Sequence, residues 1–195
     1  MYIDFENLLI LMICYLIGSI PFGLIISLIL KKNDPRLIGS KNIGATNIVR
    51  ASGWKLGLLT LLCDILKGFI PIFLFKYQSL LINYMIFLIF LGHLFPIWIK
   101  FKGGKGIAVI IGCLLGYNYL FGIVFLTVWL AVALLSKYSS LSALIASITT
   151  MIVIYLKDDQ LNYIMLLIVI MIFLKHFSNI KRLLSGNESK IILKK

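Results

Sequence analysis

The sequence predicts an all-α integral membrane protein with about seven transmembrane helices, an N-terminus outside and a C-terminus in the cytoplasm. The first observation is composition: 61% of the 195 residues are hydrophobic and 13% are charged, whereas soluble domains carry about 25% charged residues. A chain of this size has too much surface to bury so many apolar side chains, so the excess must face lipid. The second observation is a series of long apolar runs, and the third is the uneven placement of basic residues between them. Length alone predicts a single domain over residues 1–195.

The apolar runs are long enough to cross a membrane, which takes a helix of about 20 residues. The first run contains Gly18-Ser19-Ile20-Pro21, so we expect its helix to be kinked there. The last run is short, and Lys175 is expected to extend its side chain to the membrane surface. The runs that each predict one helix cover residues 8–30, 56–75, 80–99, 141–156 and 161–174.

A further run over residues 107–135 contains no charged residue. As one helix it would be roughly 43 Å long, well beyond a hydrocarbon core of about 30 Å. The tripeptide Gly116-Tyr117-Asn118 is typical of a turn. We therefore expect two short helices in this run, which brings the total to seven.

The basic residues support this count. With seven crossings and an outside N-terminus, all 19 lysine and arginine residues except Lys67, Lys76 and Lys157 fall on one side. Cytoplasmic loops carry the excess of such residues, so this side is expected to face the cytoplasm. A single helix over residues 107–135 would place Lys105 and Lys137 on opposite sides and remove the asymmetry.

Charge and cysteine placement argue against several other classes. The net charge is +12, but the cations lie in short breaks between apolar runs and not in the long exposed patches that bind nucleic acid. Cys14, Cys63 and Cys113 lie inside apolar runs without metal-ligand spacing, so neither a disulfide nor a metal site is expected. The acidic N-terminus, with Asp4 and Glu6, argues against a cleaved signal peptide.

Residues 39–47, with Arg50 one turn further on, form the first polar cluster on the expected inner face. Its glycines let backbone N–H groups approach an anion, and the start of a following helix favours negative charge. Arginine can hold phosphate through two hydrogen bonds. Four uncharged polar side chains of the cluster, named below, can donate further hydrogen bonds. The alternative interpretation is a flexible loop with helix caps. The four side chains are Ser40, Asn42, Thr46 and Asn47.

The second cluster is Lys100-Phe101-Lys102-Gly103-Gly104-Lys105-Gly106, preceded by Gly92-His93. Three lysines around adjacent glycines indicate an anion-binding nest. The spacing is not that of a nucleotide-binding P-loop. The alternative is a membrane-border anchor, which explains the lysines but not the glycines.

The third cluster is divided between residues 137–140, which include Ser139 and Ser140, and residues 175–182. In the second segment His176, Asn179 and Arg182 are spaced to share much of one helical face. Taken alone, a histidine at a membrane edge is more often a hydrogen-bonding residue than a catalyst.

Asp64 and Lys67 are three residues apart within an apolar run. Charges inside a membrane are functional candidates by default, but the simpler interpretation is a mutually neutralising pair packed inside the bundle. His93 is likewise interpreted as an ordinary buried hydrogen-bonding residue.

The sequence contains no Ser-His-Asp order that would support a triad, no metal-ligand spacing and no His-x4-Asp dyad. Any reaction would therefore need a substrate that is already activated, with the protein supplying position and positive charge. We expect the three clusters to meet at one membrane border and to neutralise two anionic head groups there.

Taken together, these segments resemble the bacterial acyl-phosphate-dependent glycerol-3-phosphate acyltransferases, in the family's order from about residue 15 to residue 190. One departure from the family pattern is Lys41, where glycine is expected. The matching residues are Gly18-Ser19-Ile20-Pro21-Phe22-Gly23, residues 39–47 with Arg50, Asp64 with Lys67-Gly68, Gly92-His93-Leu94-Phe95-Pro96, residues 101–106, Tyr138-Ser139-Ser140-Leu141, and His176 with Asn179, Arg182 and Gly186.

The resemblance implies a cofactor-free enzyme of phospholipid biosynthesis, a single transmembrane acyltransferase domain in the bacterial inner membrane with its active site toward the cytoplasm. It would transfer an acyl group from acyl phosphate to the 1-hydroxyl of glycerol-3-phosphate, giving lysophosphatidic acid and phosphate. Besides these substrates, its partners would be membrane lipids and other phospholipid-synthesis enzymes, and not nucleic acid. The residues carried over as catalytic are Ser40, Arg50, Lys105, His176 and Asn179, and those carried over as substrate-binding are Asn42, Thr46, Asn47, Lys102, Gly103, Gly104, Ser139 and Ser140. Glu188 reads as structural.

Two further points stay open at the level of sequence. The proton of the attacking hydroxyl can go to the phosphate of the donor, or to His176, since an imidazole titrates near neutrality. The rival functions are a transporter for phosphorylated metabolites and a non-catalytic scaffold. Transport sites lie near the membrane midplane between related repeats, and no repeat is evident here.

Overall fold

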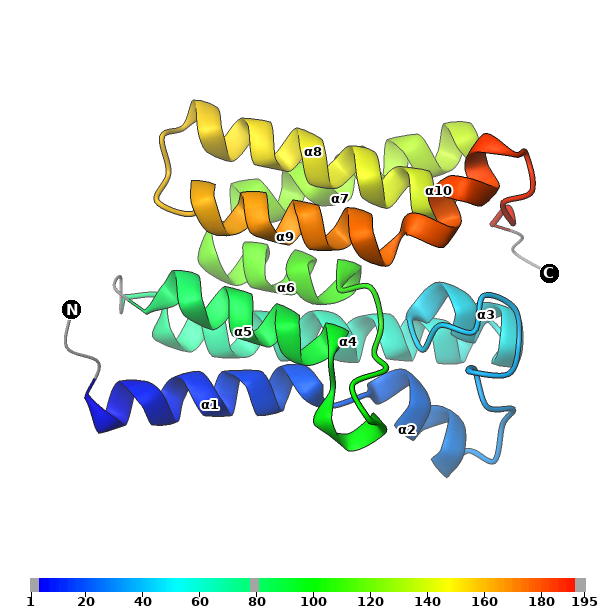
Figure 1. Ribbon diagram of the computed structural model, residues 1–195, viewed down its shortest axis with the longest axis horizontal. Helices are drawn as coiled ribbons and strands as arrows, with labels where there is room; N and C mark the ends of the chain where they lie inside the picture. The colour runs from blue at the N-terminus through cyan, green and yellow to red at the C-terminus, as the bar shows by residue number, and fades with distance from the viewer. Residues whose placement is uncertain (1–3, 78–80, 192–195) are drawn as a thin grey trace. The chain divides into compact units, whose positions relative to one another are not determined.

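The computed structural model describes residues 4–77 and 81–191, and all of the regular secondary structure in these ranges is helical (Figure 1). Leu80, with which one expected helix begins, and the basic residues Lys194 and Lys195 lie outside them. The helices are α1 (Phe5–Ser19), α2 (Phe22–Ile29), α3 (Ala45–Ser52), α4 (Trp54–Phe75), α5 (Ile82–Leu94), the short 3-10 helix η1 (Ile97–Ile99), α6 (Ile107–Tyr117), α7 (Tyr119–Ser136), α8 (Ser139–Leu156), α9 (Asn162–Lys175) and α10 (Phe177–Leu184).

The chain divides into two compact units, which are described separately below. Unit 1 comprises residues 1–117 and contains α1 to α6, whereas unit 2 comprises residues 118–195 and contains α7 to α10.

In unit 1 the first apolar run is broken into α1 and α2, whose axes differ by 47°. The break falls at Ile20 and Pro21, because proline cannot continue the helical hydrogen-bond pattern. The predicted kink is therefore confirmed. In α2 the hydroxyl of Ser27 donates to the carbonyl of Gly23 over 2.8 Å, which satisfies a polar group that is fully buried.

Unit 1 is held together by helix pairs that approach each other closely at glycines. A Cβ atom added to Gly68 of α4 would overlap the carbonyl oxygen of Val109 in α6, and one added to Gly112 of α6 would overlap that of Ile65 in α4. The α1–α5 pair is built in the same way at Gly18, which faces the carbonyl of Ile89. Small residues of this kind let helices pack tightly in a membrane, where lipid gives no hydrophobic drive for association.

The uncharged run over residues 107–135 forms two helices, as predicted. It is interrupted at Asn118, whose backbone is extended and whose side-chain oxygen accepts the N–H of Leu120 over 3.0 Å. An asparagine that caps the next helix in this way ends the preceding one.

Among residues 4–77 and 81–191, four helices are long and apolar enough to cross a membrane, and the number rises to six if the bent pairs α1–α2 and α9–α10 each count as one span. The expected seventh helix, α6, has 11 residues, which corresponds to about 16 Å and is short of a hydrocarbon core of about 30 Å. Length and composition therefore support four to six spans, fewer than the seven predicted. The four unbent candidate spans are α4 (Trp54–Phe75), α5 together with η1 (Ile82–Ile99), α7 (Tyr119–Ser136) and α8 (Ser139–Leu156).

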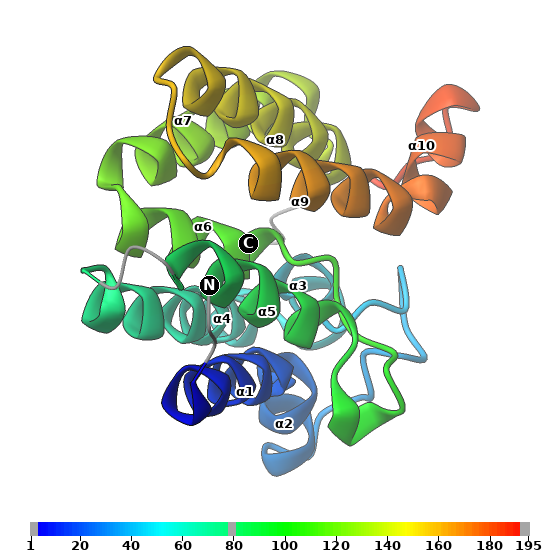
Figure 2. The ribbon, with the colours of Figure 1, turned by 60° about the vertical axis from the view of Figure 1, so that its left-hand side comes forward.

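Unit 2 consists of the paired helices α7 and α8 with α9 beside α8. The axis of α10 is turned by 59° from that of α9 at His176, and the chain then returns toward the start of α8 (Figure 2). There the N–H of Ile191 donates to the carbonyl of Lys137 over 2.7 Å. Residues far apart in the sequence, at the α7–α8 junction and in the tail, are thereby brought together.

Candidate active site

Asn47 organises the loop of the first polar cluster. Its side chain is 2% exposed, and its Oδ1 accepts the N–H of Ser40 over 2.9 Å. Its Nδ2 lies within hydrogen-bond distance of three backbone carbonyls, those of Pro35 (2.8 Å), Ile38 (3.0 Å) and Asn42 (2.8 Å). Nearly all of the hydrogen-bonding groups of this amide are bonded to the backbone of the loop. Asn47 therefore shapes the loop, and its contact with a substrate stays a prediction.

The loop contains two residues with left-handed backbone, Gly39 at φ +57° and Lys41 at φ +58°. This conformation costs an L-residue roughly 1–2 kcal/mol and costs glycine nothing. It gives a physical reason for the glycine that the resemblance leads us to expect at the position of Lys41. Lys41 adds a cation at an exposed position.

The other predicted residues of the first cluster surround this loop. Ser40 and Asn42 are half-buried within it, and Thr46 is half-buried in the first turn of α3. Arg50 is exposed one turn further on, and a Cβ atom on Gly39 would lie 3.7 Å from its Cδ. The structure thus brings the predicted residues of this cluster together on one short helix and the loop before it.

The glycines of the second cluster pack against the end of α5. A Cβ atom on Gly103 would overlap the carbonyl of His93, and one on Gly104 would overlap Nε2 of the same histidine. Gly106 has φ +83° and lies against the ring of Phe90. These contacts explain why glycine is required, which sequence reasoning had attributed to anion binding alone. Anion binding by this loop stays a prediction.

The lysines of the second cluster have different degrees of exposure. Lys102 is exposed and Lys105 is half-buried. Lys100 and Phe101 both have left-handed backbone, at φ +53° and +61°, so the chain turns sharply after η1. In Figure 1 the first cluster lies beside α3, at the end of unit 1 opposite the N-terminus, and the second cluster runs from η1 back to the start of α6.

Asp64 and Lys67 form a buried ion pair in α4. Lys67 Nζ lies 2.8 Å from Asp64 Oδ1, and the two side chains are 2% and 3% exposed. The expected pairing is therefore confirmed. The ammonium also lies 3.0 Å from Nδ1 of His93, so the expected hydrogen-bonding histidine belongs to the same group.

Glu188 connects the two segments of the third cluster. Its Oε1 accepts the hydroxyl of Ser140 over 2.8 Å and Nδ2 of Asn179 over 2.7 Å. Its Oε2 accepts Nε of Arg182 over 2.7 Å. The prediction that Asn179 and Arg182 share a face is confirmed, and the structural interpretation of Glu188 agrees with these contacts.

The environment of Glu188 favours its charged form. Burial disfavours the carboxylate, but the hydrogen bonds from Asn179, Ser140 and Arg182 outweigh it and hold the pKa below its usual value. Donors to an ionised carboxylate form bonds about twice as strong as neutral ones. The carboxylate therefore fixes the side chains around it.

His176 is almost fully buried at the bend between α9 and α10. Its Nδ1 lies 2.8 Å from the carbonyl oxygen of Ile172. A carbonyl only accepts, so Nδ1 carries a proton and, in the neutral ring, Nε2 carries the lone pair. Ser139, the first residue of α8, is half-buried next to Ser140.

Two elements of this geometry lay beyond sequence reasoning: the convergence of three donors on Glu188 and the contact of His93 with Gly104. A signal for the first existed, because Glu188 is the only acidic residue after Asp159 in a strongly basic tail. The second depends on how a loop folds against a helix end and has no local signature. Within residues 4–77 and 81–191, no group of three or more His, Cys, Asp or Glu side chains is placed to hold a metal ion.

The family model for glycerol-3-phosphate acyltransferases matches residues 8–186. The chain belongs to the glycerol-3-phosphate acyltransferase family. Similar members include glycerol-3-phosphate acyltransferases of Bartonella quintana, 48% identical over 97% of this chain and 93% of the relative, and of Francisella tularensis, 43% identical over 96% and 94%.

The fold is also that of a solved member of this family. The crystal structure of PlsY (YgiH), an integral membrane glycerol 3-phosphate acyltransferase in its glycerol 3-phosphate form, is 35% identical, with a TM-score of 0.89 and 95% of each chain covered. A second structure, of its lysophosphatidic acid form, is 34% identical, with a TM-score of 0.86 and the same coverage. This protein is therefore an integral membrane acyltransferase of phospholipid synthesis.

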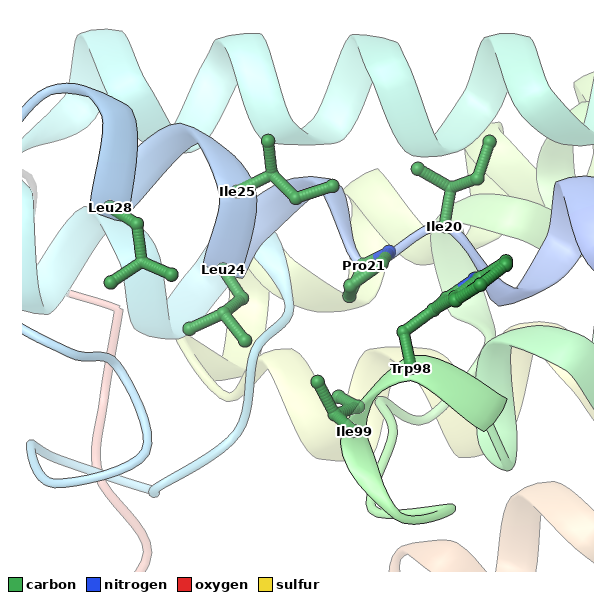
Figure 3. A pocket seen from close by; sticks show the side chains of 7 residues that line it. All are labelled: Ile20, Pro21, Leu24, Ile25, Leu28, Trp98 and Ile99. Atoms are coloured by element: carbon green, nitrogen blue, oxygen red, sulfur yellow. The ribbon is translucent and has the colours of Figure 1, made fainter.

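An apolar pocket of this acyltransferase lies in unit 1, between the break of the first helix and the segment before the glycine loop (Figure 3). Its volume is about 320 Å³. In Figure 3 the side chains of Ile20 and Trp98 lie at one end of the pocket, that of Leu28 lies at the other end, and that of Pro21 lies between them. The residues that line the pocket are Ile20, Pro21, Leu24, Ile25, Leu28, Trp98 and Ile99.

Proposed function

We propose that this protein transfers an acyl group from acyl phosphate to the 1-hydroxyl of glycerol-3-phosphate and releases lysophosphatidic acid and inorganic phosphate. The observation that carries the proposal is the match to glycerol-3-phosphate acyltransferases along almost the whole chain. The solved relative is described in forms with glycerol 3-phosphate and with lysophosphatidic acid, which are the acceptor and the product of this reaction.

The reaction needs no protein nucleophile. The oxygen of the 1-hydroxyl attacks the carbonyl carbon of the acyl phosphate, and the bond from this carbon to the phosphate oxygen breaks. Phosphate leaves with the electron pair and takes up the proton of the hydroxyl. Acyl phosphate is a mixed anhydride with a good leaving group, so the protein contributes position and charge stabilisation.

The proposed roles follow the three clusters. In the first, Ser40, Asn42 and Thr46 donate to a substrate phosphate, Arg50 neutralises it, and Asn47 holds the loop in shape. In the second, Lys102 and Lys105 attract the acyl phosphate head, while Gly103 and Gly104 let the backbone approach it. In the third, Ser139, Ser140 and Asn179 act beside His176, with Ser140 and Asn179 fixed by Glu188. These roles include all of the catalytic and substrate-binding residues that the resemblance implies.

His176 is the alternative proton acceptor. With Nδ1 donating to Ile172, Nε2 is the nitrogen with the lone pair and can take a proton from the substrate hydroxyl. Turnover of His176→Gln measured against pH separates the two routes. A near-normal rate with a flat pH profile would leave the donor's phosphate as the acceptor, and a large loss of kcat would assign the proton to His176.

For the membrane arrangement we propose seven crossings, with α6 as a short seventh, an N-terminus outside and an active site facing the cytoplasm of a bacterial inner membrane. The support is the placement of the basic residues. If α6 counts as a crossing, the total is seven and the basic loops lie on the same side of the membrane, which is the side expected to face the cytoplasm. We further propose that residues 1–195 work as one domain, so that neither unit alone turns over substrate.

The test of the reaction uses the purified full chain in detergent with lipid. Acyl phosphate and glycerol-3-phosphate together are expected to release inorganic phosphate and form lysophosphatidic acid, and omission of either substrate abolishes both products. Other acyl donors, such as acyl thioesters, are expected to be poor substitutes. Absence of product with folded protein would contradict the proposal and favour the transporter interpretation.

A further inference from the structure

The ammonium of Lys67 has three close partners: it donates to two acceptors and forms an ion pair with Asp64. They are Oδ1 of Asp64 at 2.8 Å, Nδ1 of His93 at 3.0 Å and the backbone carbonyl of Ile20 at 2.6 Å. The carbonyl of Ile20 lies at the break between α1 and α2, and backbone groups freed by such a break need a partner inside a membrane protein.

These contacts determine which nitrogen of His93 carries the proton. An ammonium only donates, so Nδ1 of His93 is an acceptor. Nδ1 lies 3.8 Å from Asp64 Oδ1, too far for a hydrogen bond, so the carboxylate does not draw a proton onto it. In the neutral ring the proton is therefore on Nε2.

Nε2 of His93 faces the glycine loop. A Cβ atom on Gly104 would overlap this nitrogen, so the ring edge with the N–H lies directly against Gly104. The backbone holds the same place, because the N–H of Gly104 donates to the carbonyl of His93 over 3.1 Å and that of Gly103 to the carbonyl of Leu94 over 3.2 Å. His93 thus contacts the loop through both its backbone and its ring.

We propose that Asp64, Lys67 and His93 form a positioning network for the glycine loop: the Asp64–Lys67 pair fixes the tautomer and ring orientation of His93, which in turn fixes the loop before Lys105. The inference rests on the proposed function, in which this loop holds the acyl phosphate head. A buried ion pair is weak evidence for stability, since apolar residues of similar volume often stabilise as well. A positioning role gives a reason for keeping the pair.

The network also reaches the apolar pocket. The carbonyl that Lys67 binds belongs to Ile20, and the side chains of Ile20 and Pro21 line this pocket together with Trp98 and Ile99 from the segment that precedes the loop (Figure 3). The ammonium of Lys67 therefore binds the backbone of one wall of this pocket.

The first test is spectroscopic and does not depend on activity. The chain contains two histidines, so a sample with ¹⁵N-labelled histidine gives signals from two rings, and His176→Gln identifies those of His93. The neutral His93 ring is expected to carry its proton on Nε2, and the double variant Asp64→Leu/Lys67→Met to show a mixture of tautomers. A proton on Nδ1 in the native protein would overturn the inference, as would an unchanged tautomer in the double variant.

The second test separates binding from folding. The double variant removes both buried charges and is expected to keep the thermal midpoint within a few degrees. Its KM for acyl phosphate is expected to rise and its kcat/KM to fall by about 10- to 100-fold, the range seen when the orienting partner of a histidine is removed in metal sites, while KM for glycerol-3-phosphate changes little. Ser147→Ala, which removes the bond from a buried hydroxyl in α8 to the Leu144 carbonyl, is the matched control and keeps native kinetics. Unchanged kinetics in a folded double variant would contradict the proposal.

A pair of single variants decides the case if the double variant does not fold. Glutamine at 93 places an amide N–H near the position of Nε2, whereas asparagine places its amide near that of Nδ1. His93→Gln is expected to retain several-fold more activity than His93→Asn at equal thermal midpoints. The reverse order, or equal activity, would overturn the proposal. Because the native protein is assayed alongside, an inactive native protein would count against the acyltransfer proposal and not against the network.

Discussion

At the scale of the residue, each unit contains a polar side chain that forms hydrogen bonds with several partners and fixes the segments around it. Asn47 ties four backbone groups of one loop together, and Glu188 ties the α7–α8 junction to α10. A buried group with several bonds costs more to remove than one with a single bond, because each former partner is left unsatisfied.

Glu188→Gln is expected to lower stability by about 2 kcal/mol at neutral pH, since a hydrogen bond to a charged group contributes more than one to a neutral group. The folded pKa of Glu188 lies below its usual value, so its contribution is complete above the unfolded pKa of about 4.3 and is lost as the pH falls through the folded pKa. Thermal midpoints in detergent, measured from pH 7 down to pH 3, should show the gap between native protein and variant closing at the acidic end. Glu6→Gln, at an exposed residue, is the control; a gap that widened with acid would contradict the assignment.

Asn47→Asp is expected to reduce activity by at least about 10-fold, because it keeps the acceptor for Ser40 but places a carboxylate among carbonyl oxygens, at a cost of about 1–3 kcal/mol. The measurement is phosphate release at saturating acyl phosphate. Asn33→Asp makes the same change at an exposed position of the neighbouring segment and should stay near native activity. Equal effects of both variants would show that added charge, and not the loss of the loop contacts, is responsible.

The sequence indicated which residues matter better than it indicated what each of them contacts. The Asp64–Lys67 pair was predictable because three residues on a helix span less than a turn and two opposite charges in an apolar run need each other. The glycines of the second cluster were predicted to matter, but their packing against His93 was not, because it depends on where a distant helix ends. The contacts by which Asn47 shapes its loop were not predictable, because the sequence cannot show which carbonyls a folded loop turns inward; its contact with substrate stays a prediction.

At the scale of elements, helix contacts depend on glycine. Alanine at Gly112 or at Gly68 would push its methyl group into the backbone of the facing helix, and overpacking of this kind costs about 1–3 kcal/mol. Either variant is expected to lower the thermal midpoint of the protein in detergent. Gly44→Ala is the matched control, since its methyl group would meet nothing closer than 3.4 Å; a loss as large as that of Gly112→Ala would argue against tight α4–α6 packing.

The elements themselves were largely predictable. Apolar runs give helix positions because lipid requires every backbone group to be bonded within its own segment, and Pro21 and Asn118 mark breaks through their local chemistry. The bend at His176 was not predicted, because α10 continues directly from α9 in a sequence with neither proline nor glycine at that point. The number of crossings was also not determined, since a helix of 11 residues such as α6 can be buried by protein and still connect two sides.

At the scale of the whole molecule, the proposed topology is testable by labelling. Single cysteines, in a background without Cys14, Cys63 and Cys113, would be introduced at Lys41, Lys102, Lys181 and Asp158 and exposed to a membrane-impermeant maleimide in sealed vesicles. The first three are expected to react from the cytoplasmic side and Asp158 from the opposite side. Reaction of Lys41 and Lys102 from different sides would end the proposal that both loops serve one active site.

The return of the tail to the α7–α8 junction has a consequence for biosynthesis. Chains emerge from the ribosome N-terminal part first, so α7 to α10 are made before Glu188 and Ile191 exist to bind Ser140 and Lys137. Insertion into the membrane and maturation of this polar cluster are then separate events, with maturation last. We expect a nascent polypeptide arrested before Glu188 to contain all of its helices but to lack the contacts that fix Ser140 and Asn179.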